Sequence, residues 1–322
     1  MNEKLYRPQF NKLESAEKLA LMETLAARYE MAFLGLHTFD RWGQSCTTGV
    51  FRKDGREFVF VPGDTVTLGW EQFAVGLNQE SREELDYIFG EMEYTGSPRE
   101  FILENMAPVR QAAVGPMLAG RELEELGWEP IAPDDPRLTA HPDWLKQFRE
   151  FAATGRDSLT RVGCARFERD GDSWQIYLYH ELNYFAFLDL LRQQGLSLPT
   201  ADEWAYLCGG GCRTLFPWDD GLKDTMHLYH FEGPEDRDKP YDMEEPNFFG
   251  LSIAYDPYQR EVVEADAFTT CGGDGGCNIC GGLGPFIGFL PCSPHYKPEV
   301  HEDDVLNGDY DFYRPIIRAE LE

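Results

Sequence analysis

Beyond residue 207, this chain of 322 residues shows almost no regular hydrophobic periodicity. The stretch is rich in Gly, Pro and Asp, and only short strand-like pieces interrupt it. Long irregular segments of this kind need a scaffold of regular elements elsewhere in the chain, and such loops often carry function. Since 42% of the residues are hydrophobic, the chain can supply a core for that scaffold. We therefore expect one core that holds long functional loops.

The first two thirds of the chain carry the patterns of helices and hairpins. Apolar residues recur at helical spacing from Ser15 to Leu36, and Asp-Gly pairs between β-rich runs mark tight hairpin turns. The expected helices cover residues 15–36, 77–93, 116–127, 142–154 and 180–194, and the expected hairpin turns lie at residues 53–56 and 170–172. The fold class is α+β. We divide the chain into an N-terminal helical extension, residues 1–45, and a second domain, residues 46–322.

The charge of the chain restricts its partners. It has 57 acidic and 29 basic residues, a net charge of −28, which argues against nucleic acid and anionic membranes as partners. No apolar run approaches the roughly 20 residues that a membrane helix needs. The first residues show no apolar region of a secretory signal. We expect a cytoplasmic protein whose thiols stay reduced.

Three cysteines and six glycines crowd into the run CGGDGGCNICGG, residues 271–282. With Cys292, the cysteines Cys271, Cys277 and Cys280 form a cluster within a short window, which is typical of metal or redox chemistry in a reduced compartment. A zinc site of these four cysteines is one interpretation, and Cys208 and Cys212 could replace the outer two. The other interpretations are a redox pair at the Cys-x-x-Cys motif and buried structural thiols.

A helix is expected to start in the run LSLPTADEW, residues 196–204. Thr200 can cap it, and Glu203 stands three residues later, as in a capping box. Trp204 and Trp218 are expected to be mostly buried in one core.

Four segments in order resemble the formylglycine-generating enzyme, or sulfatase-modifying factor, family. The densest is LSLPTADEWAYLCGGGCRTLFPWDDGL, residues 196–222, which resembles the family's helix start and its later Pro-Trp motif. The others are FVFVPGDTVTLG at 58–69, PNFFGLSIA at 246–254 and FYRPIIR at 312–318. The resemblance implies a variant of the C-type lectin fold, with small twisted sheets, two main helices and much irregular loop.

The resemblance also implies an activity. Catalytic members oxidise a substrate cysteine with O2 at a copper ion held by two cysteines. Cys277 falls at the first of these positions, whereas Gly282 stands at the second and Cys280 lies two residues too early. The resemblance therefore implies a metal-dependent, oxygen-using oxidoreductase that acts on a thiol in a peptide, protein or small molecule, with Cys277 and Cys280 as metal ligands and catalytic residues. The glycine at 282 and a missing arginine-containing run favour the alternative, a non-catalytic lectin-like binding module.

Structural calcium is a further feature that the resemblance implies. The corresponding segment is QREVVEAD, in which Glu261 and Glu264 stand three residues apart and offer carboxylate oxygens to a hard cation. The alternative is a strand end with solvated acids. The histidines His227 and His230 have His-x-x-His spacing, and we interpret them as residues of a polar loop.

Overall fold

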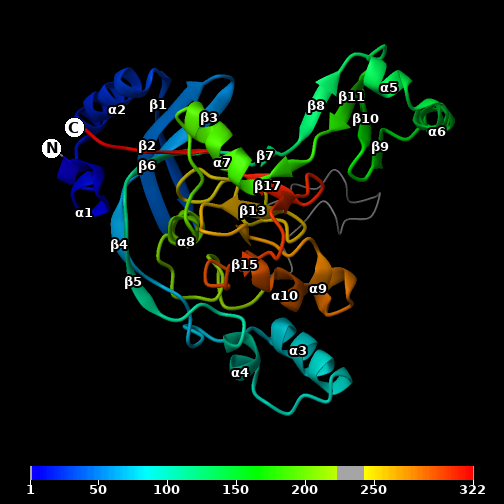
Figure 1. Cartoon of the computed structure of the whole chain (residues 1–322). Coiled ribbons are helices and arrows are strands. Elements are labelled where there is room, and N and C mark those ends of the chain that lie inside the picture. The colour runs from blue at the N-terminus through cyan, green and yellow to red at the C-terminus, as the bar shows by residue number, and fades with distance from the viewer. Residues whose placement is uncertain (1, 223–242, 322) are drawn as a thin grey trace.

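The computed structural model describes residues 2–222 and 243–321 (Figure 1). Helices contain 30% of the residues and strands contain 29%, which confirms the α+β class. The helices are η1 (Asn2–Leu5), α1 (Arg7–Phe10), α2 (Ser15–Tyr29), α3 (Gln79–Glu91), α4 (Pro98–Leu103), α5 (Pro136–Thr139), α6 (Pro142–Ala152), α7 (Tyr184–Gln193), α8 (Ala201–Gly209), α9 (Cys277–Cys280), α10 (Gly284–Phe289) and η3 (Leu290–Cys292). The strands are β1 (Ala32–Arg41), β2 (Gln44–Lys53), β3 (Arg56–Val61), β4 (Asp64–Leu68), β5 (Arg110–Val114), β6 (Met117–Gly120), β7 (Glu124–Glu125), β8 (Trp128–Ile131), β9 (Ser158–Arg161), β10 (Ala165–Asp170), β11 (Ser173–Tyr179), β12 (Leu182–Asn183), β13 (Arg260–Val263), β14 (Thr269–Cys271), β15 (Glu299–Val300), β16 (Val305–Leu306), β17 (Asp311–Tyr313) and β18 (Ile316–Arg318).

Two five-stranded sheets organise the main body. One is antiparallel throughout, in the order β1-β2-β3-β6-β18, and the other has the order β15-β14-β13-β17-β7. Helices α2, α3, α7, α8 and α10 contribute buried residues to the same core as both sheets. The second sheet matters for function, because β13 and β14 lead into the glycine-rich run.

The turn between β2 and β3 is the hairpin that the Asp-Gly pair predicts. Lys53 pairs with Arg56, and Asp54 and Gly55 both have positive φ, 51° and 81°. Two successive residues with positive φ are the signature of the tight turn that suits the twist of an antiparallel pair. The predicted hairpin at 170–172 is confirmed too, since Asp170 pairs with Ser173.

The predicted helix over residues 15–36 is wrong in its second half. Helix α2 ends at Tyr29, and Glu30 takes the left-handed conformation with φ 54°. The chain then forms β1, which pairs with β2 along its whole length. Phe33 fits a helical spacing but packs on Phe51 across the sheet, with ring centroids 5.4 Å apart. The division at residues 45 and 46 passes through β2.

The predicted helix over residues 116–127 is also wrong. The segment forms β6 and β7, and β6 lies between β3 and β18. All four residues of β6 are buried. A strand buried on both faces shows no alternation, so its apolar run cannot be told from a buried helix by pattern alone.

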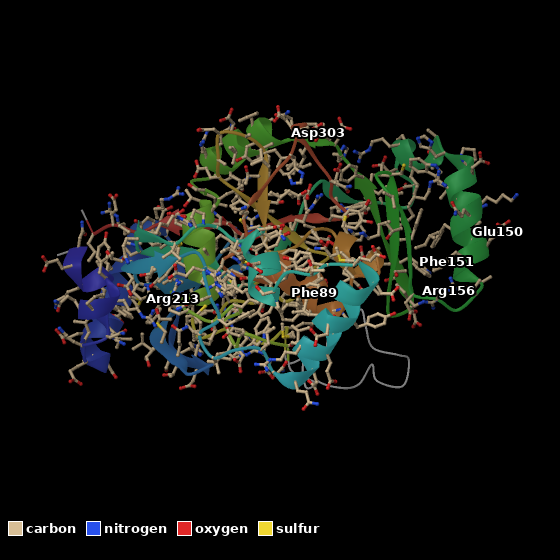
Figure 2. The ribbon with its side chains drawn as sticks, turned by 90° about the horizontal axis from the view of Figure 1, so that it is seen from below. Phe89, Glu150, Phe151, Arg156, Arg213 and Asp303 are labelled. Atoms are coloured by element: carbon tan, nitrogen blue, oxygen red, sulfur yellow. The ribbon has the colours of Figure 1, made fainter. Side chains whose placement is uncertain are left out.

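A smaller unit, residues 128–179, stands beside the main body, and we call it the satellite unit. It consists of the sheet β8-β11-β10-β9 with α5 and α6 (Figure 1, upper right). It has its own buried cluster, which consists of Leu138, Ala165, Phe167, Ile176 and Leu178. Figure 2 shows Glu150, Phe151 and Arg156 on this unit, away from the main body that carries Phe89 and Arg213. The expectation of a single core is therefore wrong.

Helix α8 begins as its sequence predicts. The Thr200 hydroxyl accepts the backbone N–H of Glu203 at 3.3 Å, and the Glu203 carboxylate accepts that of Thr200 at 2.8 Å, which completes the capping box. Trp204, one residue later, is 1% exposed. Trp218 is partly buried and stacks on Phe216 with ring centroids 4.9 Å apart.

Candidate functional site

The glycine-rich run forms a tight loop between β14 and α9. Gly272, Gly275 and Gly276 have positive φ, between 70° and 86°, which residues with a side chain rarely adopt. At Gly273 an added Cβ would lie 2.5 Å from the carbonyl oxygen of Gln259. The glycines therefore let this loop turn sharply and press against the neighbouring backbone.

The structure separates the four clustered cysteines into two kinds. Cys271 and Cys292 are buried, and burial raises the pKa of both thiols well above the usual range, so they are neutral. The Cys292 thiol donates to the carbonyl of Gly272 at 3.1 Å. Within residues 2–222 and 243–321 no three His, Cys, Asp or Glu side chains come together as metal ligands. The residues present therefore do not fit a four-cysteine zinc site.

Cys277 and Cys280 are exposed and begin and end the single turn α9. Residues three apart lie on one face of a helical turn. The Cys280 sulfur lies 3.3 Å from the hydroxyl of Tyr258, and this hydrogen bond, together with burial, raises the pKa of Tyr258 to about 12. Two accessible thiols on one turn form a donor set that suits a soft two-coordinate ion such as Cu(I).

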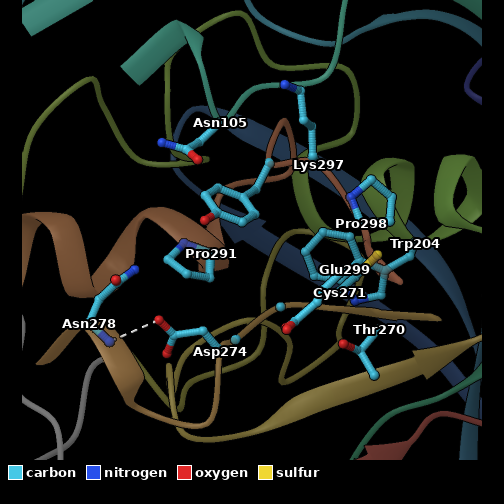
Figure 3. A pocket seen from close by; sticks show the side chains of 13 residues that line it. Asn105, Trp204, Thr270, Cys271, Asp274, Asn278, Pro291, Lys297, Pro298 and Glu299 are labelled. Carbon is cyan, nitrogen blue, oxygen red and sulfur yellow. Dashed lines mark hydrogen bonds between the residues drawn. The ribbon is translucent and has the colours of Figure 1, made fainter. Parts of the chain in front are cut away.

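A cavity of about 330 Å³ lies beside this turn (Figure 3). It is lined by Asn105, Trp204, Thr270, Cys271, Gly272, Gly273, Asp274, Asn278, Pro291, Tyr296, Lys297, Pro298 and Glu299. Cys277 and Cys280 are not among these residues, but Asn278, which lies between them in α9, is. The single turn α9 therefore contributes one residue to the cavity wall and also carries the two exposed thiols.

Two buried polar atoms of cavity-lining residues lack a hydrogen-bond partner in the described part of the chain. They are the indole nitrogen Nε1 of Trp204 and the carboxylate oxygen Oδ1 of Asp274. The other carboxylate oxygen of Asp274 accepts the backbone N–H of Asn278 at 3.0 Å, the bond drawn in Figure 3. Burial raises the pKa of the Asp274 carboxyl, and backbone N–H groups oppose that effect. Both atoms have almost no accessible surface, so a ligand in the cavity does not contact them directly.

The two acids predicted to bind calcium are held by arginines instead. Arg314 contacts both oxygens of Glu261 at 3.2 and 3.3 Å, and both side chains are buried. Glu264 accepts hydrogen bonds from Arg192 and Arg318, each at 3.1 Å. Calcium requires six to eight oxygen ligands, so this arrangement does not fit the ion. Of the predicted histidines, His227 and His230 lie outside the described residues.

A further cysteine outside the glycine-rich run, Cys212, lies near a histidine. Its sulfur is 3.8 Å from Nε2 of His295. Burial raises the pKa of Cys212 to about 12 and lowers that of His295 to about 4, so both groups are neutral near pH 7. The Nε2–H group of His295 donates to the carbonyl of Thr214 at 3.0 Å. The pair is therefore a structural contact rather than an activated thiol.

This buried histidine makes the fold sensitive to acid. His295 binds a proton with a pKa of about 6.5 in the unfolded chain and about 4 in the folded chain. Acidification through that window therefore favours the unfolded state, by up to about 3 kcal/mol. Urea titrations at pH 7 and pH 4 measure this effect. Between these two pH values, the free energy of unfolding of His295→Gln should fall by about 3 kcal/mol less than that of the wild-type chain. Equal losses in the two proteins would contradict this account.

Asp274, Asn278 and the Trp204 indole N–H were not predicted as site residues. The signal that the sequence offered was the position of Asp274 as the single acidic residue in the glycine-rich run at 271–282. Comparison of the sequence with protein-family models and with curated proteins found no match. Among the helices that the structure describes, none has the length and apolarity to span a membrane.

Proposed function

We propose that the chain is a divergent member of the formylglycine-generating enzyme group, with its lectin-like fold, and that it acts as a module that binds a small polar ligand in the cavity beside α9. The ordered motifs, the capped helix α8 and the several small sheets support the fold assignment. The observation that carries the function is the cavity of about 330 Å³, whose lining includes the polar residues Asp274, Asn278 and Lys297. The charge of −28 supports a cytoplasmic protein that avoids nucleic acid and membranes.

A screen of small polar fragments by ligand-observed NMR tests this binding function. We expect binders whose affinity falls at least about tenfold in Asn278→Tyr, because the larger side chain fills the cavity while the backbone N–H still serves Asp274. The matched control is Asn11→Tyr, which places the same residue on an exposed position at the end of α1. No binder at all, or binders that ignore Asn278→Tyr, would reject the proposal.

A second candidate function is copper-dependent oxidation of a peptide or small-molecule thiol. The observation that favours it is the exposure of Cys277 and Cys280 on one turn at the margin of the cavity. When bound, copper would supply O2 chemistry, and the two thiols would hold it. Titration with Cu(I) should then give one tight site that Cys277→Ser abolishes and Cys164→Ser, in the satellite unit, retains. If the copper site is lost in both variants, or is retained in both, copper-dependent oxidation is rejected as a function.

A further inference from the structure

The turn α9 places two accessible thiols at a spacing that a disulfide can bridge. All eight cysteines lie within the described residues, and Cys277 and Cys280 are the two that are exposed. The backbone N–H of Cys280 donates to the carbonyl of Gly276 at 2.8 Å, so the turn is helical. In a helix, Cα atoms three residues apart lie about 5 Å from each other. Disulfides join Cα atoms that are about 4.4–6.8 Å apart, so the pair can close without unfolding the turn.

The surroundings of α9 leave room for the small movement that closing a disulfide needs. A Cβ added at Gly276, before the turn, would lie 2.2 Å from the ring of Tyr258, so this end is held firmly. A Cβ added at Gly282, after the turn, would meet no atom within 4 Å. The end that carries Cys280 therefore has free space beside it.

Tyr258 contacts one of the two thiols and favours its reduced form. The Tyr258 hydroxyl lies 3.3 Å from the Cys280 sulfur. That hydrogen bond, together with burial and the carboxylates of Asp256 and Asp274, raises the pKa of Tyr258 to about 12, so the phenol stays a donor at neutral pH. The sulfur of a thiolate is a stronger acceptor than the uncharged sulfur of a disulfide. The contact therefore stabilises the reduced pair relative to the disulfide.

We infer that Cys277 and Cys280 carry out thiol–disulfide exchange with small disulfides. One thiolate of the pair attacks a sulfur of the substrate R–S–S–R and releases RS−, and the other then attacks the mixed disulfide and releases the second RS−. The two protein thiols lose two electrons and two protons, and the substrate takes them up as two RSH. This activity goes beyond the proposed ligand binding and does not depend on it.

The charge around the pair selects the substrate class. Asp256 and Asp274 are the charged side chains besides Cys280 that act on Tyr258, and the whole chain has a net charge of −28. Such a field concentrates cations near the surface and repels anions. The substrates are therefore small cationic disulfides, for which cystamine is a probe, whereas oxidised glutathione is anionic. At low salt we expect cystamine to react at least about tenfold faster than oxidised glutathione, and high salt should narrow the difference.

Mass spectrometry of the full reduced chain, treated with cystamine in the presence of a chelator and then alkylated, tests the exchange. The wild-type chain should lose two hydrogens and show a disulfide between Cys277 and Cys280. Cys277→Ser and Cys280→Ser should each stop at the mixed disulfide, while Cys164→Ser, in the satellite unit, should form the same disulfide as the wild type. A wild-type chain that carries only mixed disulfides, or a disulfide that persists in Cys277→Ser, would overturn the inference. Faster reaction of oxidised glutathione than of cystamine would overturn the substrate class.

The exchange equilibrium tests the contact with Tyr258. Tyr258→Phe removes the donor to Cys280, so the equilibrium with cystamine and its thiol should shift severalfold toward the protein disulfide. Tyr310→Phe is the matched control, because this tyrosine packs against Gly275 of the same loop, and it should leave the equilibrium unchanged. Thermal melts show whether both variants are folded. An equal equilibrium constant in Tyr258→Phe and the wild-type chain would contradict the role given to Tyr258.

Discussion

Replacing Arg314 with leucine should lower the free energy of unfolding by about 3–5 kcal/mol, because the substitution leaves the Glu261 carboxylate buried without a counter-charge. Both side chains are buried, and the guanidinium also donates to the carbonyls of Gly120 and Ser252, each at 2.6 Å. Arg314 therefore ties β17 and β13 to the segments around residues 120 and 252. Urea unfolding at pH 7 provides the measurement.

Two further variants make this result specific to the buried pair. Arg52→Leu removes an ion pair with Glu57 whose arginine is half exposed, and it should cost at most about 1 kcal/mol. The double variant Glu261→Leu and Arg314→Leu should recover part of the loss, since no unpaired charge remains. A loss for Arg314→Leu that is no larger than that for Arg52→Leu would show that the buried pair does not have the role assigned to it.

Truncation of Trp204 to alanine should cost about 3–5 kcal/mol, the range expected for a fully buried large aromatic. The indole is 1% exposed and packs beneath the loop, since a Cβ at Gly272 would lie 3.0 Å from its Cζ2 atom. The variant should also lose binding of the polar fragments found in the NMR screen, because the cavity loses one wall. Tyr87→Ala is the control, since that aromatic side chain is 70% exposed and its removal should be nearly neutral. A chemical melt that Trp204→Ala barely moves would contradict the packing described.

Local signals explain the parts of the fold that the sequence predicted correctly. The capping box of Thr200 and Glu203 and the turn at Asp54 and Gly55 need only neighbouring residues, so their geometry can be read from a few letters. Strand β6 depends on β3 and β18, which lie far along the chain, whereas β1 depends on β2, which follows it directly but lies outside residues 15–36. Phe33 belongs to a strand because β2 lies beside it, and no pattern within residues 15–36 contains that information.

The same distinction applies to the site. The sequence located the loop, since glycines and thiols crowd there, but it could not separate buried Cys271 and Cys292 from exposed Cys277 and Cys280. Burial depends on α10, η3 and β13, which the loop meets only in three dimensions. The unpartnered atoms on Trp204 and Asp274 are still less visible, because a missing hydrogen bond is a property of the surroundings and leaves no mark on the residue itself.

The position of β18 has a consequence for how the protein is made. This strand, residues 316–318, completes the sheet that contains β1 and β2, and the backbone N–H of Leu321 donates to the Asn2 side chain at 3.0 Å. The main body therefore cannot close on the ribosome until nearly all of the described residues have been synthesised. The satellite unit, whose strands all come from residues 128–179, can fold as soon as it emerges. During synthesis the unfinished main sheet exposes β6 as an open edge, which can pair with another chain until β18 covers it.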